Sequence, residues 1–207
     1  TDYGTDLLSS INSSACIMDE FLCLVRHTRT AMSEGICYGQ TDIDVADTFC
    51  SEYPAVVSQL AGIEFDLIYS SPLKRCLRLA ELFSNDILPD SRLLEVNFGD
   101  WEGVRWDDIF GSPDGKKWFS DYTSMRCPGG ESFIDLQQRA WSFLQDISGK
   151  GKRILAVTHA GLMRAMLVSL GLEEADTVFG KKIPFGGVVM LEKTQQGYIC
   201  RTKLEPR

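Results

Sequence analysis

The chain contains only two histidines, and each stands directly after an apolar run that reads as a β-strand. His27 follows residues 21–26 and His159 follows residues 153–158. An open α/β sheet places its ligand crevice at the carboxyl ends of its strands, so both imidazoles could face one site. An unprotonated imidazole is a nucleophile. The pair therefore predicts histidine chemistry on an anionic substrate.

Two arginines stand at positions suited to binding that anion. Arg26 precedes His27, and both side chains reach one ligand only if the chain bends there, because neighbouring side chains in a strand point to opposite faces. Arg75 lies in the first turn of an expected helix, where exposed backbone N–H groups attract anions. A guanidinium offers paired donors to a phosphate. Taken alone, each arginine is more typical of a structural or surface role.

One acidic residue stands in an apolar context that suits proton transfer. Glu95 lies between Leu94 and Val96, and an apolar environment favours the protonated form of a carboxyl group. Glu95 fits this role better than Glu102, which lies beyond a glycine at an expected helix start. After the second histidine, the small Ala160 lets the backbone approach a ligand at a helix N-terminus.

Strand and helix patterns alternate along the chain and must position these side chains. Strands are predicted at 21–26, 65–70, 153–158 and 187–192, and helices at about 45–61, 72–84, 131–147 and 160–170. The first three strands are almost continuously apolar, as in strands covered on both faces. The pattern predicts an α/β fold, a three-layer sandwich whose mostly parallel central sheet has helices on both faces.

The domain organisation is expected to be simple. The first methionine before the first strand is Met18, so residues 1–17 are expected to be a cloning remnant or a loose extension. Residues 18–207 are predicted to form a single domain. Within it, the aromatic-rich segment 99–127 is too short to bury its own core. It is predicted to leave the sheet as a wall or lid over a site, or equally as a helical pair packed on the sheet edge.

Composition excludes several classes of function. The formal net charge is -8, which argues against a nucleic-acid partner because a phosphate backbone demands a broad basic face. Any phosphate site must then be a local basic pocket. No apolar run is long enough to span a membrane. The seven cysteines are scattered and never spaced as Cys-x-x-Cys, so neither a disulfide framework nor a zinc site is indicated, and a cytoplasmic location is expected.

The combined set of residues resembles the phosphoglycerate-mutase-like branch of the histidine phosphatase superfamily over about residues 20–192. Arg26, His27, Arg75, Glu95 and His159 match that family in order and spacing. The resemblance implies a phosphomonoesterase that acts through a phosphohistidine on His27, without a metal or another cofactor. It also implies that Arg26, Arg75 and His159 surround the phosphate oxygens, and that Glu95 acts first as a general acid and then as a general base.

Further contacts are implied by the same resemblance. The glycine that usually follows the nucleophilic histidine is Thr28 here, which adds bulk and a hydroxyl beside the phosphate. The phosphate-loop candidates are Thr28, Thr30, Gly39 and Ala160, and the leaving-group candidates are Tyr38, Gln40, Phe98 and the segment 99–127. The Arg-His-Thr form and the short Trp-Glu-Gly stretch at 101–103 are most similar to the α-ribazole phosphatases of cobalamin biosynthesis. An aromatic wall would suit the flat base of such a substrate.

Other functions stay open at this stage. A phosphoglycerate mutase would need extra basic residues for the substrate carboxylate, and the region around Trp106 offers aromatic residues instead. A broad phosphatase of sugar phosphates or nucleotides is a second alternative, and a protein that binds phosphate ligands without turnover is a third. The expected partner is in each case a small-molecule phosphomonoester. The sequence predicts no oligomeric state.

Overall fold

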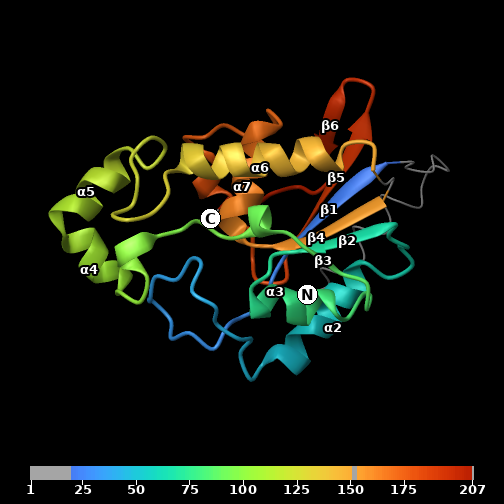
Figure 1. The fold of residues 1–207 in the computed structure, drawn as a ribbon, viewed down its shortest axis with the longest axis horizontal. Helices are drawn as coiled ribbons and strands as arrows, with labels where there is room; N and C mark the ends of the chain where they lie inside the picture. Colours follow the sequence, from blue (N-terminus) through green and yellow to red (C-terminus); the bar gives the residue numbers. More distant parts are fainter. Residues whose placement is uncertain (1–19, 151–152, 207) are drawn as a thin grey trace.

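The computed structural model describes residues 20–150 and 153–206. A six-stranded mixed sheet forms the centre of the fold (Figure 1). The spatial order of the strands is β3-β2-β4-β1-β5-β6. The first four strands run parallel, and the β5–β6 hairpin joins β1 in the antiparallel sense. The strands span Phe21–Arg26 (β1), Leu67–Ser70 (β2), Leu88–Pro89 (β3), Arg153–Thr158 (β4), Val188–Thr194 (β5) and Gly197–Cys200 (β6).

The central strand β1 shows why the sheet is buried on both sides. Its alternate residues enter two separate apolar clusters: Leu22 and Leu24 belong to one, and Cys23 and Val25 to the other. All four have at most 1% of their surface exposed. A strand with apolar side chains on both faces needs a helical layer on each side of the sheet.

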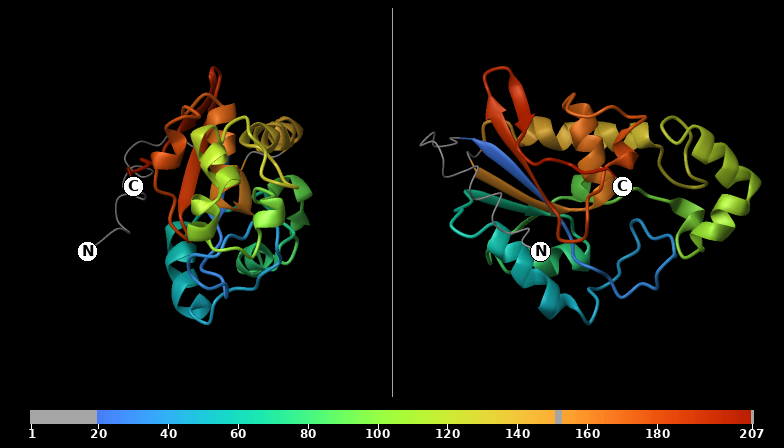
Figure 2. Two further views of the ribbon diagram at one scale, coloured as in Figure 1. Left: turned by 90° about the vertical axis from the view of Figure 1, so that its left-hand side faces the viewer. Right: turned by 180° about the vertical axis from the view of Figure 1, so that it is seen from behind.

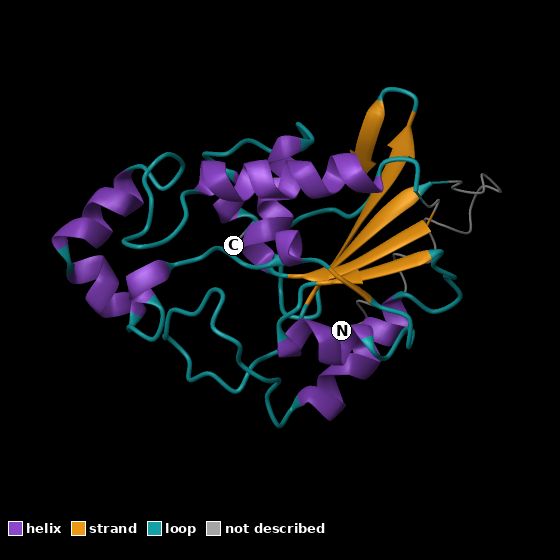
Figure 3. Cartoon of the chain, in the orientation of Figure 1, coloured by secondary structure: helices purple, strands orange, loops and turns teal. Residues whose placement is uncertain are grey.

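Helices cover both faces and complete the three predicted layers (Figures 2 and 3). One apolar cluster packs β1 and β4 against α6 (Phe133–Ile147) and α7 (Ala160–Ser169). The other packs the opposite face of the sheet against α2 (Phe49–Gln59) and α3 (Lys74–Ala80). The predicted α/β fold class is confirmed.

The boundaries of several elements differ from those predicted. The strands at 21–26 and 153–158 are confirmed to the residue, whereas the helix expected from residue 45 begins at Phe49. The reason is that Val45 pairs with Thr30 in a β-bridge and is therefore extended. The helix expected over 131–147 begins at Phe133, behind a capping box of Ser132 and Asp135. The expected cloning remnant or loose extension, residues 1–17, lies outside the described residues.

The segment 99–127 forms a projection beyond the carboxyl ends of β1 and β4 (Figures 1 and 2). It contains a short 3₁₀ helix and two α-helices, α4 (Trp106–Gly111) and α5 (Pro113–Ser120). Its base shares a small apolar cluster with Cys37. Further 3₁₀ turns lie at Ser91–Leu93 and Val178–Gly180. In the described ranges, no helix has both the length and the apolar character needed to cross a membrane.

Candidate active site

A cavity of about 820 Å³ lies at the carboxyl ends of the parallel strands, between the sheet and the projection. Cationic and imidazole groups form one part of its wall, and aromatic rings form another. The charged and polar lining residues include Arg26, His27, Arg29, Thr30, Ser33, Glu34, Arg75, Glu95 and Arg164. The aromatic lining residues are Tyr38, Phe98, Trp106, Phe110, Trp118, Phe119, Tyr122, Phe179 and Phe185. The cavity therefore combines an anion-binding region with an apolar one.

His27 follows β1 directly and is held in one tautomer. Its Nδ1 lies 2.7 Å from the carbonyl oxygen of Thr28. A carbonyl can only accept a hydrogen bond, so Nδ1 carries the proton and Nε2 keeps a free electron pair. Burial, followed by the positive charges of Arg75 and Arg26, lowers the pKa of His27 well below its ordinary value. The imidazole is thus neutral at physiological pH, the state that a nucleophile requires.

His159 ends β4 and lies beside His27. The two rings meet edge to face, with centroids 5.1 Å apart. His159 Nε2 is 2.8 Å from the hydroxyl oxygen of Ser71 and 3.5 Å from the sulfur of Cys76. Burial above all lowers the pKa of His159 as well, and the positive charges of Arg75 and Arg26 act in the same direction. The side chain has no exposed surface and is absent from the cavity lining.

The adjacent residues Arg26 and His27 both border the cavity, so the chain does bend after β1, and Arg75 borders the same cavity. The guanidinium of Arg26 donates to the Ile183 carbonyl at 2.6 Å and stacks 3.8 Å above the centre of the Phe185 ring. Arg75, on α3, is fully buried and donates to the carbonyls of Gly39 and Thr41. Its Nε is buried without a partner among the described residues. A buried donor left open beside a cavity is a position where an anionic ligand gains a hydrogen bond.

Glu95 reaches the cavity from the segment between β3 and the projection. Its Oε1 accepts from the N–H of Val96 at 3.0 Å, and its Oε2 accepts from the N–H of Gly161 at 3.1 Å. A Cβ on Gly161 would lie 2.2 Å from Oε1. The glycine after Ala160 therefore provides room for this carboxylate at the start of α7.

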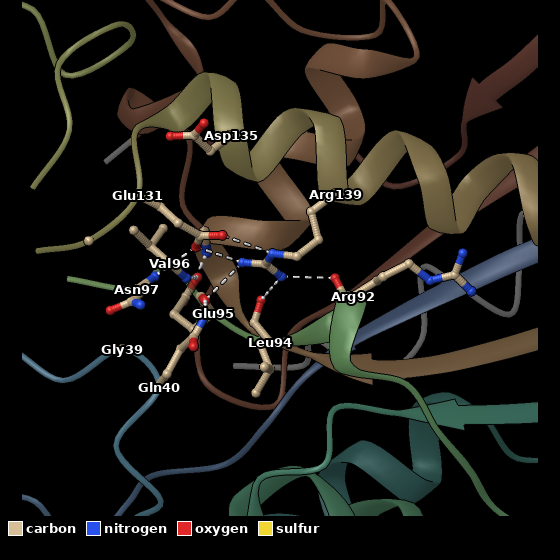
Figure 4. Close-up of polar contacts among 12 residues, drawn as sticks. Gly39, Gln40, Arg92, Leu94, Glu95, Val96, Asn97, Glu131, Asp135 and Arg139 are labelled. Carbon is tan, nitrogen blue, oxygen red and sulfur yellow. Dashed lines mark hydrogen bonds and ion pairs between the residues drawn. The ribbon is translucent and has the colours of Figure 1, made fainter. Parts of the chain in front are cut away.

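A residue that the sequence analysis missed holds the Glu95 segment in place (Figure 4). Arg139, on α6, donates to the carbonyl oxygens of Arg92, Leu94 and Glu95 at 2.9, 2.7 and 3.0 Å. The same guanidinium pairs with both carboxylate oxygens of Glu131, at 3.1 and 2.9 Å. All three guanidinium nitrogens are used. Apolar neighbours in the sequence predicted Glu95, but no local pattern marks an arginine that binds carbonyls more than 40 residues away.

The structure places the other predicted contact residues in several different settings. Thr30, Tyr38, Phe98 and Ala160 line the cavity. Thr28 is fully buried, its hydroxyl has no partner among the described residues, and it borders a second cavity of about 470 Å³. Gly39 and Gln40 do not line the main cavity. Gly39 accepts from Arg75 through its carbonyl, and the Gln40 amide donates to the Glu95 carbonyl at 3.1 Å.

The projection supplies the aromatic part of the cavity wall. Phe110 and Phe119 stack with centroids 4.2 Å apart, and Trp106 contacts both rings. Trp106 also meets Phe98 edge to face at 5.2 Å. Phe110 and Phe119 remain 47% and 37% exposed, which is unusual for stacked phenyl rings in a core. The projection therefore forms one wall of the cavity.

One spacing in the chain also matches a cysteine-dependent phosphatase, because five residues separate Cys23 from Arg29. The structure does not support such a site. Cys23 is fully buried in the middle of β1, and burial raises the pKa of its thiol to about 12. Among the described residues, no group of three or more His, Cys, Asp or Glu side chains could hold a metal ion.

Comparison with known proteins agrees with this geometry. Residues 22–203 match the model of the histidine phosphatase superfamily, branch 1. Phosphoserine phosphatase 1 of Hydrogenobacter thermophilus is 27% identical over 158 residues, which cover 72% of this chain and 75% of that protein. A 2,3-bisphosphoglycerate-dependent phosphoglycerate mutase of Azorhizobium caulinodans is 28% identical over 84% of this chain and 92% of that protein. The α-ribazole phosphatase of Shigella flexneri superposes with a TM-score of 0.80 at 23% identity, covering 89% and 96% of the two chains.

Proposed function

The chain belongs to branch 1 of the histidine phosphatase superfamily and is a phosphomonoesterase, and we propose that it dephosphorylates α-ribazole 5′-phosphate in cobalamin biosynthesis. The assignment of this substrate rests on the aromatic wall of the cavity. We assign roles in catalysis to His27, Glu95, Arg26 and Arg75 from their positions in this cavity and their chemistry. A reducing cytoplasm, expected from the scattered cysteines, suits such a biosynthetic step.

In the first half of the proposed reaction, His27 is the nucleophile. Its Nε2 electron pair attacks phosphorus, a phosphorus–nitrogen bond forms, and the bond to the ester oxygen breaks. Glu95 gives its proton to the departing alkoxide, so the alcohol leaves in neutral form. The bond from Nδ1 to the Thr28 carbonyl supports this step, because it keeps the proton away from the attacking nitrogen.

In the second half, water replaces the imidazole. The Glu95 carboxylate takes a proton from the water as the new phosphorus–oxygen bond forms and the phosphorus–nitrogen bond breaks. Arg26 and Arg75 neutralise the phosphate oxygens in both halves, the electrostatic contribution that phosphoryl transfer depends on most. His159 is neutral in the free protein because of its lowered pKa and does not line the cavity, so its proposed contribution is to support the His27 ring through their edge-to-face contact.

The aromatic wall supports a leaving group that carries a flat base. Rings from Trp106, Phe110 and Phe119 lie on the projection, and Tyr38 and Phe98 extend the wall toward the phosphate region. No lysine or arginine from the described residues of the projection lines the cavity. Stacking and burial of an aromatic base on such a wall gain free energy, whereas a small charged leaving group gains little. The projection itself therefore offers no cation for the carboxylate that a phosphoglycerate mutase must hold.

A second candidate is a phosphatase of small carboxylated substrates such as phosphoserine. Arg164 on α7 favours it, because its buried guanidinium borders the cavity. That guanidinium donates to the Lys181 carbonyl at 3.0 Å and lies 5.4 Å from the Phe179 ring centre. A cation in this position could pair with a substrate carboxylate. The similarity to a phosphoserine phosphatase gives this candidate additional support.

A substrate panel tests the proposal. We expect kcat/KM for α-ribazole 5′-phosphate to exceed that for nucleoside monophosphates, phosphoserine and phosphoglycerates by at least about tenfold. A smaller preference would refute the assignment, and a preference for phosphoserine that Arg164→Met abolishes would establish the second candidate. Mutase activity is measured with a bisphosphate primer. Trapped phosphohistidine should map to His27, and binding of phosphate esters without turnover would instead indicate a non-catalytic protein.

A further inference from the structure

Glu102 is the acidic residue at the start of the projection that the proposed mechanism does not use. Its carboxylate is half-buried and directed at the loop 39–41. Oε1 accepts from the backbone N–H of Gln40 at 2.8 Å and of Phe98 at 3.2 Å, and Oε2 accepts from the backbone N–H of Thr41 at 2.7 Å. The Thr41 hydroxyl makes a further short bond to Oε2. These four bonds of the carboxylate are therefore all made to the loop or to the adjoining segment.

The loop that Glu102 holds is also the loop that orients Arg75. Arg75 Nη1 donates to the Thr41 carbonyl at 2.9 Å, and Nη2 donates to the Gly39 carbonyl at 2.7 Å. The carboxylate thus binds the N–H groups of the loop, and the guanidinium binds its carbonyls. Two of the three guanidinium nitrogens are fixed in this way, and the third, Nε, is left for a ligand.

Close packing makes this connection stiff. A Cβ on Gly39 would lie 2.0 Å from the Val96 carbonyl oxygen and 2.7 Å from Glu102 Oε1, so only glycine allows this approach. Backbone bonds between Cys37 and the residues Gly103 and Val104, each 2.8 Å long, join the two segments further. The loop therefore has little freedom to move without the base of the projection.

The charge state of Glu102 fits a hydrogen-bond acceptor and not an acid. Partial burial raises the pKa of this carboxyl, but the bonds from Thr41, Gln40 and Phe98 outweigh that effect and lower it below its ordinary value. A general acid must hold a proton near neutral pH. Glu102 is instead an anion at neutral pH that is surrounded by hydrogen-bond donors.

We propose that Glu102 is a positioning residue that sets the orientation of the Arg75 guanidinium for phosphate through the loop 39–41. The inference rests on the proposed role of Arg75 as a phosphate ligand. The same loop bonds the Glu95 carbonyl through the Gln40 side chain. Movement of the aromatic projection is consequently linked to movement of Arg75, because Glu102 at the base of the projection is hydrogen-bonded to the loop 39–41 that holds the Arg75 guanidinium.

Glu102→Gln tests this link with inorganic phosphate as the probe. We expect the inhibition constant of phosphate to rise about tenfold and kcat/KM to fall by a similar factor, because bonds to a charged acceptor are lost. The fall should be equal for alkyl and nitrophenyl phosphates. Amide hydrogen exchange in residues 38–42 should accelerate. Glu192→Gln, another largely buried carboxylate that pairs with Arg201 on the β5–β6 hairpin, should change none of these values.

A double-mutant cycle separates an action through Arg75 from a general loss of structure. In an Arg75→Lys background, Glu102→Gln should weaken phosphate binding by less than about twofold. Additive effects, or unchanged amide exchange, would overturn the inference, and so would a larger loss for alkyl phosphates, because it would show that Glu102 acts through the Glu95 segment and not through Arg75. If Arg75→Lys binds phosphate normally, the proposed function fails instead. Thr41→Val, which removes one bond only, gives the same test with a smaller effect if Glu102→Gln does not fold.

Discussion

Replacing Arg139 with methionine tests whether the Glu95 segment must be held in place for proton transfer. Methionine keeps much of the apolar side chain but donates no hydrogen bond. The carbonyls of Arg92, Leu94 and Glu95 then lose their donor, and Glu131 loses its cationic partner. Both the stability of the fold and the position of one carboxylate should change.

The effect on stability follows from the burial of the ion pair. The side chains of Arg139 and Glu131 are 16% and 20% exposed, so solvent screens the pair only in part. Removing one partner of a buried pair costs about 3–5 kcal/mol, and hydrogen bonds to charged groups contribute about 1.5–3 kcal/mol each. Water can replace some of these bonds at the exposed edge. We expect the free energy of unfolding to fall by about 3 kcal/mol.

The effect on activity should depend on the leaving group. A displacement of about 1 Å can cost about 100-fold in rate, and a general acid contributes about 100- to 10,000-fold in total. We therefore expect kcat/KM for an alkyl phosphate to fall about 100-fold. Nitrophenyl phosphate should lose less than about tenfold, because nitrophenolate is a weak base and leaves without a proton.

Steady-state kinetics with both substrates and urea unfolding measure the two effects. The control is Arg126→Met, since Arg126 also meets an aspartate of α6, Asp135, at 2.6 Å but is 64% exposed. That variant should keep wild-type kinetics and nearly wild-type stability. Equal losses for the two substrates in Arg139→Met would show that the arginine does not act through Glu95, and the reasoning would be refuted.

Three further predictions follow from burial, close packing and the aromatic wall. Burial above all lowers the pKa of both His27 and His159, so the unfolded chain binds protons that the folded chain does not, and the free energy of unfolding should fall as pH drops below 6.5. Urea unfolding at several pH values measures this fall, and replacing both histidines with asparagine should make the free energy of unfolding less dependent on pH. Gly39→Ala should destabilise the protein by more than about 2 kcal/mol, because the new methyl overlaps a backbone carbonyl, while Gly111→Ala, with open space around it, should not. Phe119→Ala should raise KM for substrates with an aromatic base about tenfold and leave glycerol phosphate unchanged; a uniform change would argue against the wall as the base-binding surface.

The sheet and its helices were predictable wherever hydrophobic periodicity is strong. The central strands at 21–26 and 153–158 have apolar side chains on both faces, and their boundaries are those observed. The edge strand Leu88–Pro89 was not predicted, because its two residues are both exposed and are too few to show a hydrophobic alternation. The strand Gly197–Cys200 is half-buried along its length and was missed for a similar reason. Strands of this kind form because a neighbour offers free backbone groups.

The predicted site residues came from strand ends and from family resemblance, and the structure brings four of the five predicted catalytic residues to one cavity: Arg26, His27, Arg75 and Glu95. The supporting residues were not predictable in the same way. Arg139 reaches carbonyls from the middle of a helix, and the bonds of Glu102 join segments about 60 residues apart. Such contacts depend on how elements pack, so no local pattern or spacing records them.

The central position of β1 has a consequence for the order in which the protein can assemble during synthesis. Both strands that pair with β1 lie in the last third of the chain, beginning at Arg153 and Val188. A nascent chain that has left the ribosome only as far as residue 150 therefore has a β1 with no partner and an exposed strand edge on each side. The loop with His27 gains its backbone bond to Thr158 only after β4 emerges, and its bond to Gly186 later still. Pairing over such long sequence separations slows folding, so the catalytic end of the sheet should be among the last parts of the protein to form.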